Sequence, residues 1–439
     1  MYESITEDFF TFLKQAPTCF HVVEVLRQHL LQAGYAELTE DTRWELREHS
    51  RYFITRNGSS LIAFQLPKKN FSGFQLAASH SDSPGFKLKA QPEMAAAGRY
   101  TRLNVERYGG MLYAPWFDRP LSIAGRVIVR TGDEFCCRLV DIDRTLLIPN
   151  LAIHMDRNAN DAKKYNPQVD LLPVLGDETA MDCLFPLLAE KLDVDPQQIV
   201  SSDLFLYNRM EPVFWGMNHE FIAGPRLDDL QCTYASFRGF LDAENTENVP
   251  VFAVFDNEEV GSGTKQGASG TFLKDTLRRI HLSCGHDEEA FLRSLAVSFM
   301  VSADNAHAVH PNHAELSDEG NRPHLNGGVV IKYNANQKYT TDAVSAAIMK
   351  TICEKAGVPY QEFHNRSDLV GGSTLGNLSN LQVSLNTVDI GLAQLAMHSA
   401  YECAGAKDTA YMAAALRQFY SSHIRLSSAG CLTLESPAF

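Results

Sequence analysis

Histidine and carboxylate side chains recur where short apolar runs of the sequence end. The set consists of His80 and Asp82 at the end of run 74–82, Asp228 and Asp229 after the turn-like residues 224–226, Asp256, Glu258 and Glu259 after run 251–255, Asp304 at the end of run 298–304, and His398 after run 384–393. These runs have the composition of buried strands. Residues at the carboxyl ends of neighbouring strands meet at one edge of an α/β sheet, so the pattern indicates a single site.

A pair of divalent metal ions would explain so many ionisable groups in one place. Buried acids are costly unless they are paired or bound to a cation. Two such ions typically share one carboxylate and a water whose pKa they lower, and a separate carboxylate then accepts the proton of that water. Adjacent side chains at a strand end diverge, so Glu258 and Glu259 suit a division into base and ligand. The residues alone leave open which of the two does which.

Each element of this set also has an ordinary structural interpretation. A His-x-Asp triplet such as His80 to Asp82 is common by chance, with the second residue supporting the first in some metal sites. Asp228 and Asp229 after Gly-Pro-Arg are equally typical of a helix start, where a carboxylate caps free backbone N–H groups. A Glu-Glu pair before a glycine-rich turn is usually a solvated loop. Their occurrence together at successive strand ends favours the metal site.

The surrounding elements predict an α/β protein with a mixed sheet flanked by helices and a β-rich insertion. Apolar spacing over 5–31 predicts two helices broken at Pro17, with Thr18 as a cap, and Asn57-Gly58 predicts a hairpin turn. Helical and strand patterns alternate from 227 onward, with a last helix predicted from His398 to 420. We therefore expect an α/β body from 1–90 and 226–439, and an inserted β-rich unit at 91–225 with one helix near 177–191.

Composition excludes several functional classes. The chain has 439 residues and a formal net charge of −14, which argues against a phosphate-binding surface and hence against nucleic acid as a partner. It contains no apolar stretch of about 18 residues and no basic-then-apolar leader, so we expect a cytoplasmic protein with no membrane span. Nine scattered cysteines predict neither a disulfide framework nor a zinc finger.

Six segments, taken together and in order, resemble the aspartyl aminopeptidase family of co-catalytic zinc exopeptidases. They are SHSDSPGFKLK at 79–89, GPRLDDL at 224–230, VFDNEEVGSGTKQGASG at 254–270, SADNAHAVHPN at 302–312, GGVVIKYNANQKY at 327–339 and LAMHSAYE at 395–402. The resemblance covers essentially the whole chain.

The resemblance implies a role for each candidate residue. By similarity, His80 and Asp304 hold one metal ion, Glu259 and His398 hold the other, and Asp228 bridges them. Glu258 is then the general base, and Asp82 supports the site. The ions are expected to be Zn²⁺, although this ligand set also accommodates Co²⁺ and Mn²⁺.

The resemblance also implies an assembly. In this family the inserted domain covers the active site and forms a dimer contact, and six dimers form a hollow dodecamer. The segment PNLAIHMDRN at 149–158 resembles the one whose histidine, here His154, enters the neighbouring subunit's site and steadies the substrate or tetrahedral intermediate. Taken by itself, His154 would be interpreted as a surface or interface histidine.

Substrate preference follows from Lys332, which stands where acid-preferring members pair a basic side chain with the substrate carboxylate. The expected activity is therefore removal of N-terminal Asp or Glu from unblocked peptides. The segment 366–380 departs from the strongly acid-specific pattern, with Leu369, Val370 and Gly371 in place of Thr-Pro-Cys, so a neutral-preferring aminopeptidase stays open. A two-metal amidohydrolase acting on N-acyl amino acids stays open as well, as does an assembly component with a vestigial centre.

Overall fold

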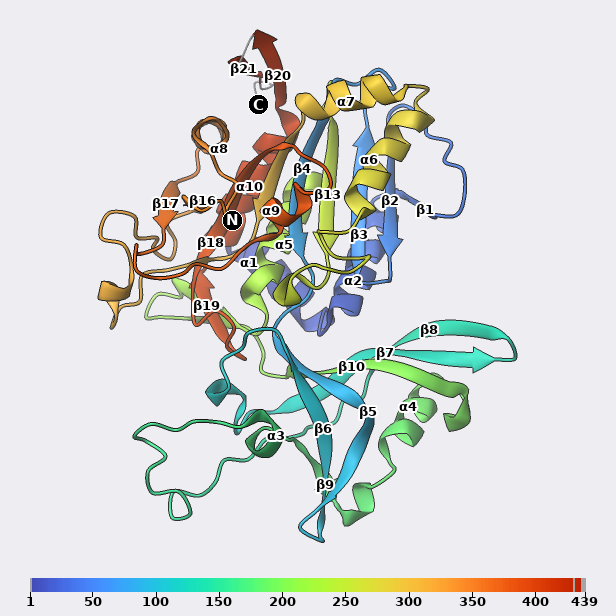
Figure 1. Ribbon diagram of the computed structural model, residues 1–439, viewed down its shortest axis with the longest axis vertical. Coiled ribbons are helices and arrows are strands. Elements are labelled where there is room, and N and C mark those ends of the chain that lie inside the picture. The colour runs from blue at the N-terminus through green and yellow to red at the C-terminus, as the bar shows by residue number, and fades with distance from the viewer. Residues whose placement is uncertain (1, 429–430, 436–439) are drawn as a thin grey trace.

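Two sheets organise the protein, a large one in the body and a smaller one beside it (Figure 1). The computed structural model describes residues 2–428 and 431–435. The helices are α1 (Tyr2–Gln15), α2 (Cys19–Gln32), α3 (Pro167–Asp170), α4 (Leu184–Leu192), α5 (Leu227–Leu241), α6 (Phe272–Ser283), α7 (Glu288–Ala296), α8 (Ala343–Ala356), α9 (Leu375–Ser379) and α10 (Asp408–Ser421).

The large sheet is mixed and has 13 strands. Its main path runs β1 (Ala36–Leu38), β2 (Ser50–Arg56), β3 (Ser60–Leu66), β13 (Val249–Phe255), β4 (Phe74–His80), β14 (Phe299–Ala303), β18 (Asn386–Leu395), β19 (Glu402–Gly405), β12 (Phe221–Gly224) and β11 (Val213–Trp215), with β15 (Ala306–His307), β16 (Val329–Tyr333) and β17 (Tyr360–His364) pairing off this path. The four central strands β13, β4, β14 and β18 are mutually parallel, so their carboxyl ends share one edge.

Helices cover both faces of the large sheet, and alternate residues along its strands divide between two cores. Phe53, Phe252 and Val301 pack on the face that carries α1, α2, α5, α8 and α10. Ile54 and Val251 pack on the opposite face with α6 and α7. Strands buried on both faces are typical of the parallel part of an α/β sheet, and β4 and β13 are buried along their whole length. The expected α/β architecture with a mixed sheet is confirmed.

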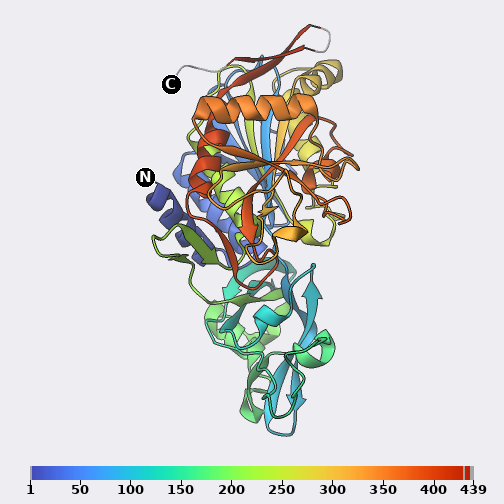
Figure 2. The same cartoon turned by 90° about the vertical axis from the view of Figure 1, so that its left-hand side faces the viewer.

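The smaller sheet is antiparallel and has six strands in the order β8-β7-β10-β5-β6-β9. Its strands are β5 (Gly85–Ala96), β6 (Tyr100–Tyr108), β7 (Leu121–Thr131), β8 (Glu134–Asp141), β9 (Val174–Asp177) and β10 (Ile199–Asn208). Figure 2 shows this unit below the body, while the hairpin of β20 (His423–Ser428) and β21 (Cys431–Glu435) projects at the opposite end. Strands β11 and β12 belong to the large sheet, although their residues lie within the range 91–225 predicted for the inserted unit. The boundaries of that unit stay a prediction.

Local signals explain several element boundaries. Asn57 and Gly58 both have positive φ (61° and 64°) and, with Ser59, form the three-residue loop between the paired residues Arg56 of β2 and Ser60 of β3. Thr18 precedes α2 in extended conformation, as expected for a cap, but its hydroxyl pairs with Nδ1 of His21 at 2.8 Å and not with the backbone. Within residues 2–428 and 431–435, no helix is both long enough and apolar enough to cross a membrane.

Two predicted helices are wrong in their extent. Helix α4 begins at Leu184 and not near 177, because Asp182 adopts the left-handed conformation (φ 60°), which interrupts a helix. The helix predicted over 398–420 forms only in its second part, as α10. His398 has φ 65°, residues 402–405 form β19 between β18 and β12, and α10 begins only at Asp408.

Candidate metal centre

The predicted ligands lie together at the carboxyl edge of the central strands. His80 is the last residue of β4, Asp304 follows β14, and His398 follows β18 by three residues. Asp228 lies in the first turn of α5, in a peptide bond to Asp229 that is cis. Glu258 and Glu259 form a short 3₁₀ turn after β13, which Asn257 begins with a left-handed φ of 62°. The residues thus come from five separate elements.

Asp228 occupies the middle of the group. Its Oδ1 lies 3.7 Å from Nε2 of His80, and its Oδ2 lies 3.3 Å from Nε2 of His398. The same His398 nitrogen lies 3.4 Å from Oε2 of Glu259. Among the described residues, three sets could each hold one ion: His80 with Asp228, Asp229 and Asp304; His80 with Glu258 and Glu259; and Asp228 with Glu259 and His398. Asp228 is thus common to the set containing Asp304 and the set containing His398.

Several acceptor oxygens at the centre have no hydrogen-bond partner among the described residues although they are buried. They are Oδ1 of Asp228, Oδ1 of Asp229 and Oε1 of Glu259. A buried carboxylate oxygen without a donor carries a large desolvation cost, which a bound cation offsets. Carboxylate and imidazole groups are ordinary ligands of Zn²⁺. The donor set therefore fits the divalent metal ions predicted from the sequence.

The acids strongly perturb one another's protonation. Burial and the charges of Asp304, Asp82 and Asp228 raise the pKa of Glu258 to about 8, although His80 opposes the shift. Burial also raises the pKa of Glu259 well above its ordinary value, with the charge of Asp228 adding to the effect. Burial alone would lower the pKa of His398, but Asp228 and Glu259 raise it to about 10. Such crowding of negative charge is typical of a site built for cations.

Ligand orientation is fixed by hydrogen bonds around the centre. Nδ1 of His80 lies 3.0 Å from the carbonyl oxygen of Asp82, and Nδ1 of His398 lies 2.6 Å from that of Gly110. Each contact fixes one ring nitrogen and leaves Nε2 directed at Asp228, the usual arrangement for a histidine ligand. Glu402 accepts hydrogen bonds from the backbone N–H groups of Asp228 (3.0 Å) and His398 (2.7 Å).

A cavity of about 320 Å³ adjoins the centre. Its lining includes His80, Asp228, Glu258, Glu259, Asp304, Lys332 and His398. Lys332 on β16 is only 2% exposed, and its Nζ donates to the carbonyl oxygen of Asp304 at 2.8 Å and lies 3.8 Å from Oδ2 of the same residue. Segment 366–380 contributes Gly372, Ser373 and Thr374 to the lining of the cavity. In the same segment, Leu369 and Val370 do not line the cavity and are 48% and 98% exposed.

Two predicted site residues do not face the cavity as ligands do. Asp82 is buried, and its carboxylate accepts hydrogen bonds from the N–H groups of Glu258 and Glu259, so it contacts the backbone that carries them. His154 is exposed on the loop between β8 and α3 and does not line the cavity. Within one subunit, His154 is therefore separate from the centre.

Two residues that hold the centre in place are not indicated by the sequence pattern. Glu402 stands in one of the quoted motifs, but nothing in its spacing indicated that it would bind two backbone segments. Tyr108, whose hydroxyl lies 2.7 Å from Oδ2 of Asp82, carried no signal at all. Both act through hydrogen bonds between segments far apart in the sequence, which residue patterns do not report.

Comparisons with known proteins give a consistent result. The chain matches the family model described as aminopeptidase I zinc metalloprotease (M18) over residues 12–420, a range that includes every residue of the centre. It is 45% identical to a probable M18 family aminopeptidase 2 of Clostridium acetobutylicum over 419 residues, 93% of this chain and 97% of that protein. It is 42% identical to the protein of the same name from Pseudomonas aeruginosa, covering 96% and 99% of the two chains.

Solved structures extend the similarity to three dimensions. A chain in the cryo-EM structure of the Ape4 and Nbr1 complex superposes with a TM-score of 0.91 at 37% identity, covering 95% of this chain and 86% of that chain. The mApe1 dodecamer of S. cerevisiae gives a TM-score of 0.83 at 28% identity, covering 95% and 97%. Coverage of this extent means that the similarity is one of the whole architecture and not of a single sheet.

Proposed function

The chain belongs to the M18 family of zinc metallopeptidases and is an aminopeptidase, and from this premise we propose that it uses two divalent metal ions, Zn²⁺ by preference, to remove N-terminal Asp or Glu from unblocked peptides. The observation that carries the proposal is the position of Asp228. One of its carboxylate oxygens faces His80 and the other faces His398, beside Glu258 and at the edge of a single cavity.

Each side chain at the centre has one part in the proposed reaction. His80 and Asp304 would hold one ion, Glu259 and His398 would hold the other, and Asp228 would be the ligand common to both. The ions, when bound, would polarise the substrate carbonyl and lower the pKa of a water. Glu258 accepts the proton of the attacking water and later gives it to the leaving amine. Asp82 keeps Glu258 and Glu259 in place through their backbone N–H groups.

Acid preference is proposed from the setting of Lys332. The ammonium group lines the cavity, and the carbonyl oxygens of Asp304 (2.8 Å) and Asn305 (3.3 Å) accept two of its hydrogen bonds. Burial opposes its charge, but the carboxylate of Asp304 raises the pKa of Lys332 well above its usual value, so it stays cationic. One N–H remains for a substrate carboxylate, and a hydrogen bond between two charged groups is among the stronger kinds.

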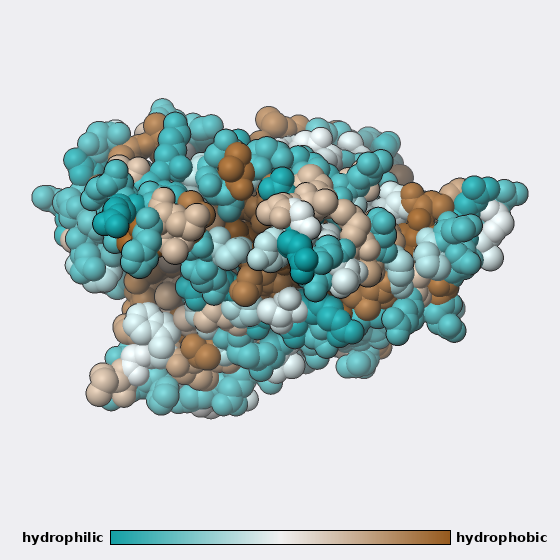
Figure 3. All heavy atoms as spheres, turned by 90° about the horizontal axis from the view of Figure 1, so that it is seen from below, coloured by the Kyte–Doolittle hydropathy of each residue, from teal (hydrophilic) through white to brown (hydrophobic). Residues whose placement is uncertain are grey.

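The proposed active form is a homo-oligomer built like the dodecamer named for the S. cerevisiae relative. The loop around His154 carries exposed apolar side chains at Leu151 (56%), Ile153 (48%) and Met155 (75%). Figure 3 views the molecule from the end at which the smaller sheet lies and shows a mostly hydrophilic surface with separate apolar areas. We propose that this loop enters a neighbouring subunit and that His154 there donates to the developing oxyanion, a contribution typically of several kcal/mol.

The test is a set of initial rates on aminoacyl substrates that share one leaving group, carrying Asp, Glu, Leu, Ala or an N-acetylated Asp. The enzyme is assayed with Zn²⁺, Co²⁺ or Mn²⁺ and with a chelator, and bound metal is counted by mass spectrometry. Release that favours Asp and Glu, stops on chelation and needs a free amine supports the proposal. Preference for Leu or Ala would overturn the acid specificity, and hydrolysis of the N-acetylated substrate would favour an amidohydrolase.

Substitution of Lys332 separates specificity from chemistry. We expect Lys332→Met to lower kcat/KM for Asp substrates by about ten- to a hundredfold, because the substrate carboxylate loses a charged partner. The kcat/KM for Leu substrates should change much less. Equal losses on both substrates would assign Lys332 a structural role beside Asp304.

A further inference from the structure

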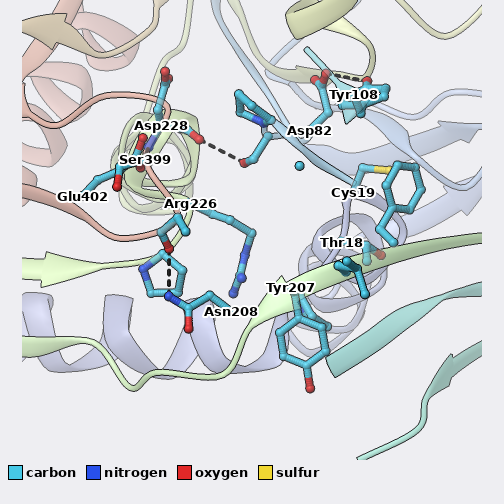
Figure 4. A pocket seen from close by; sticks show the side chains of 18 of the residues that line it. Thr18, Cys19, Asp82, Tyr108, Tyr207, Asn208, Arg226, Asp228, Ser399 and Glu402 are labelled. Carbon is cyan, nitrogen blue, oxygen red and sulfur yellow. Dashed lines mark hydrogen bonds between the residues drawn. The ribbon is translucent and has the colours of Figure 1, made fainter. Parts of the chain in front are cut away.

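Tyr108 is the last residue of β6, so it belongs to the smaller sheet, yet its side chain reaches the body of the protein. Its hydroxyl donates a hydrogen bond to Oδ2 of Asp82 at 2.7 Å and accepts one from Nδ2 of Asn257 at 2.9 Å. Figure 4 shows Tyr108 and Asp82 joined in this way beside a second cavity, distinct from the one that Lys332 lines, which lies between the two units. The ring packs edge-on against Phe205 of β10, with 5.7 Å between centroids, which fixes its direction.

Both partners of Tyr108 hold the turn that carries the two glutamates. Oδ1 of Asp82 accepts the N–H of Glu258 at 3.1 Å, and Oδ2 accepts the N–H of Glu259 at 3.2 Å. Asn257 begins this turn, and its side-chain oxygen accepts hydrogen bonds from Thr264 and Gln266. The carboxylate of Asp82 therefore lies at the start of a 3₁₀ turn, and Tyr108 donates to Oδ2, the same oxygen that accepts the N–H of Glu259.

The residues just after Tyr108 contact the other side of the centre. The carbonyl oxygen of Gly110 faces Nδ1 of His398 at 2.6 Å, and the N–H of Leu112 donates to the carbonyl oxygen of His398 at 3.0 Å. Gly109 has φ +72°, and a Cβ there would lie 3.2 Å from Cβ of Glu259, so the backbone of this segment passes directly against the site. Segment 108–112 thus touches both halves of the centre.

We infer that Tyr108 is a positioning residue of the peptidase: through Asp82 and Asn257 it fixes the backbone of Glu258 and Glu259, so that a strand of the smaller sheet sets the geometry of the catalytic centre. The inference rests on the proposed function for its effect on catalysis. The hydrogen bonds that carry it are independent of which substrate the enzyme takes.

The test compares Tyr108→Phe with the matched control Tyr113→Phe. Tyr113 directly follows segment 108–112 and does not line the cavity at the centre, and its hydroxyl accepts a hydrogen bond from Arg107 at 2.8 Å. For Tyr108→Phe we expect kcat to fall about tenfold with KM within twofold, because lost partners of metal-site residues typically cost ten- to a hundredfold in activity. Bound metal and the unfolding midpoint should match those of the control.

A second measurement needs neither substrate nor metal. Hydrogen exchange followed by mass spectrometry on the metal-free protein should show faster exchange in peptides covering 257–261 for Tyr108→Phe than for Tyr113→Phe. A third measurement uses a double variant. Tyr108→Phe should cost less kcat in an Asp82→Asn background than in the wild type, since part of its effect is carried by Asp82.

The outcomes separate the two proposals. If kcat and exchange of Tyr108→Phe both equal those of the control, or if its effect is additive with Asp82→Asn, the positioning role is wrong while the aminopeptidase stands. If the wild-type enzyme hydrolyses none of the aminoacyl substrates, the proposed function fails, and the exchange measurement still decides whether Tyr108 holds the turn.

Discussion

At the scale of single residues, Glu258 is the group on which the proposed chemistry depends most directly. It is half-buried, lines the cavity and stands next to a proposed ligand. Glu258→Gln keeps the shape of the side chain but removes its ability to accept a proton. We expect kcat to fall at least about a hundredfold, within the usual range for loss of a general base, while bound metal stays at the wild-type level. Rates with metal counts on the same sample check this, and near-normal turnover would remove Glu258 from the role.

Asp228 allows a second prediction at this scale. If one carboxylate serves both ions, Asp228→Ala should lose both together, whereas His398→Ala should lose only the ion on its own side. Metal content after equilibration with limiting Zn²⁺ measures the difference. An Asp228→Ala enzyme that still holds two equivalents would contradict the bridge.

The sequence predicts which residues gather at the centre better than it predicts how they are held. His80, Asp228, Glu259, Asp304 and His398 were predicted from strand ends and a family resemblance, and the structure brings them together. Strand periodicity is a local property, so it can place a residue at a sheet edge. Hydrogen bonds such as that from Tyr108 to Asp82 depend on how a second sheet packs, and no local pattern encodes that packing.

At the scale of elements, the last predicted helix shows the limit of local patterns. Residues 398–420 are rich in alanine and other helix formers, yet 402–405 form a strand. Pairing of β19 with both β18 and β12 outweighs the local helix preference, and Glu402 there accepts two backbone hydrogen bonds.

Helix α6 is a helix that the sequence analysis does not predict, although its apolar residues Phe272, Leu273, Leu277 and Ile280 have regular helical spacing.

Helix α6 allows a prediction about pH. His281 is packed against Phe71 and Phe291, and its Nδ1 is buried without a hydrogen-bond partner in the part of the chain that the structure describes. Burial, with the neighbouring His286, lowers the pKa of His281 to about 4, against about 6.5 in an unfolded chain. Between these values the unfolded chain binds a proton that the folded protein does not, so this residue reduces stability as the pH falls from 6.5 toward 4.

The variant that tests this is His281→Phe, which fits the aromatic surroundings and cannot take up a proton. Its unfolding midpoint should fall less steeply than that of the wild type between pH 6.5 and 4, as followed by circular dichroism. His324→Gln, at an exposed position, serves as the control and should keep the wild-type slope. The same slope in all three proteins would show that His281 titrates alike in both states.

At the scale of the whole molecule, the exposed apolar loop of the smaller unit predicts how the assembly can be weakened. Ile153→Asp places a charge in a surface that the proposed contact would bury, which is costly without a partner. Because Ile153 is 48% exposed in the single subunit, folding of that subunit should be unaffected. Sedimentation velocity should show smaller species than for the wild type. An assay of the same sample should show lower specific activity.

The matched control for the assembly is Val344→Asp, at a 49% exposed position in the first turn of α8, where an acidic residue is well tolerated. It should keep the wild-type sedimentation profile. An Ile153→Asp enzyme with unchanged sedimentation and activity would place the subunit contact elsewhere.

The strand order of the large sheet also bears on how the protein is synthesised. Strand β4, at residues 74–80, lies between β13 and β14, whose residues 249–255 and 299–303 leave the ribosome much later. The smaller sheet, in contrast, is formed by one continuous stretch from β5 to β10, residues 85–208. Long-range strand pairs form late and leave edges exposed in the meantime. The inserted unit can therefore fold while the first strands of the body still await their partners, so the nascent chain depends most on protection from aggregation at its amino-terminal end.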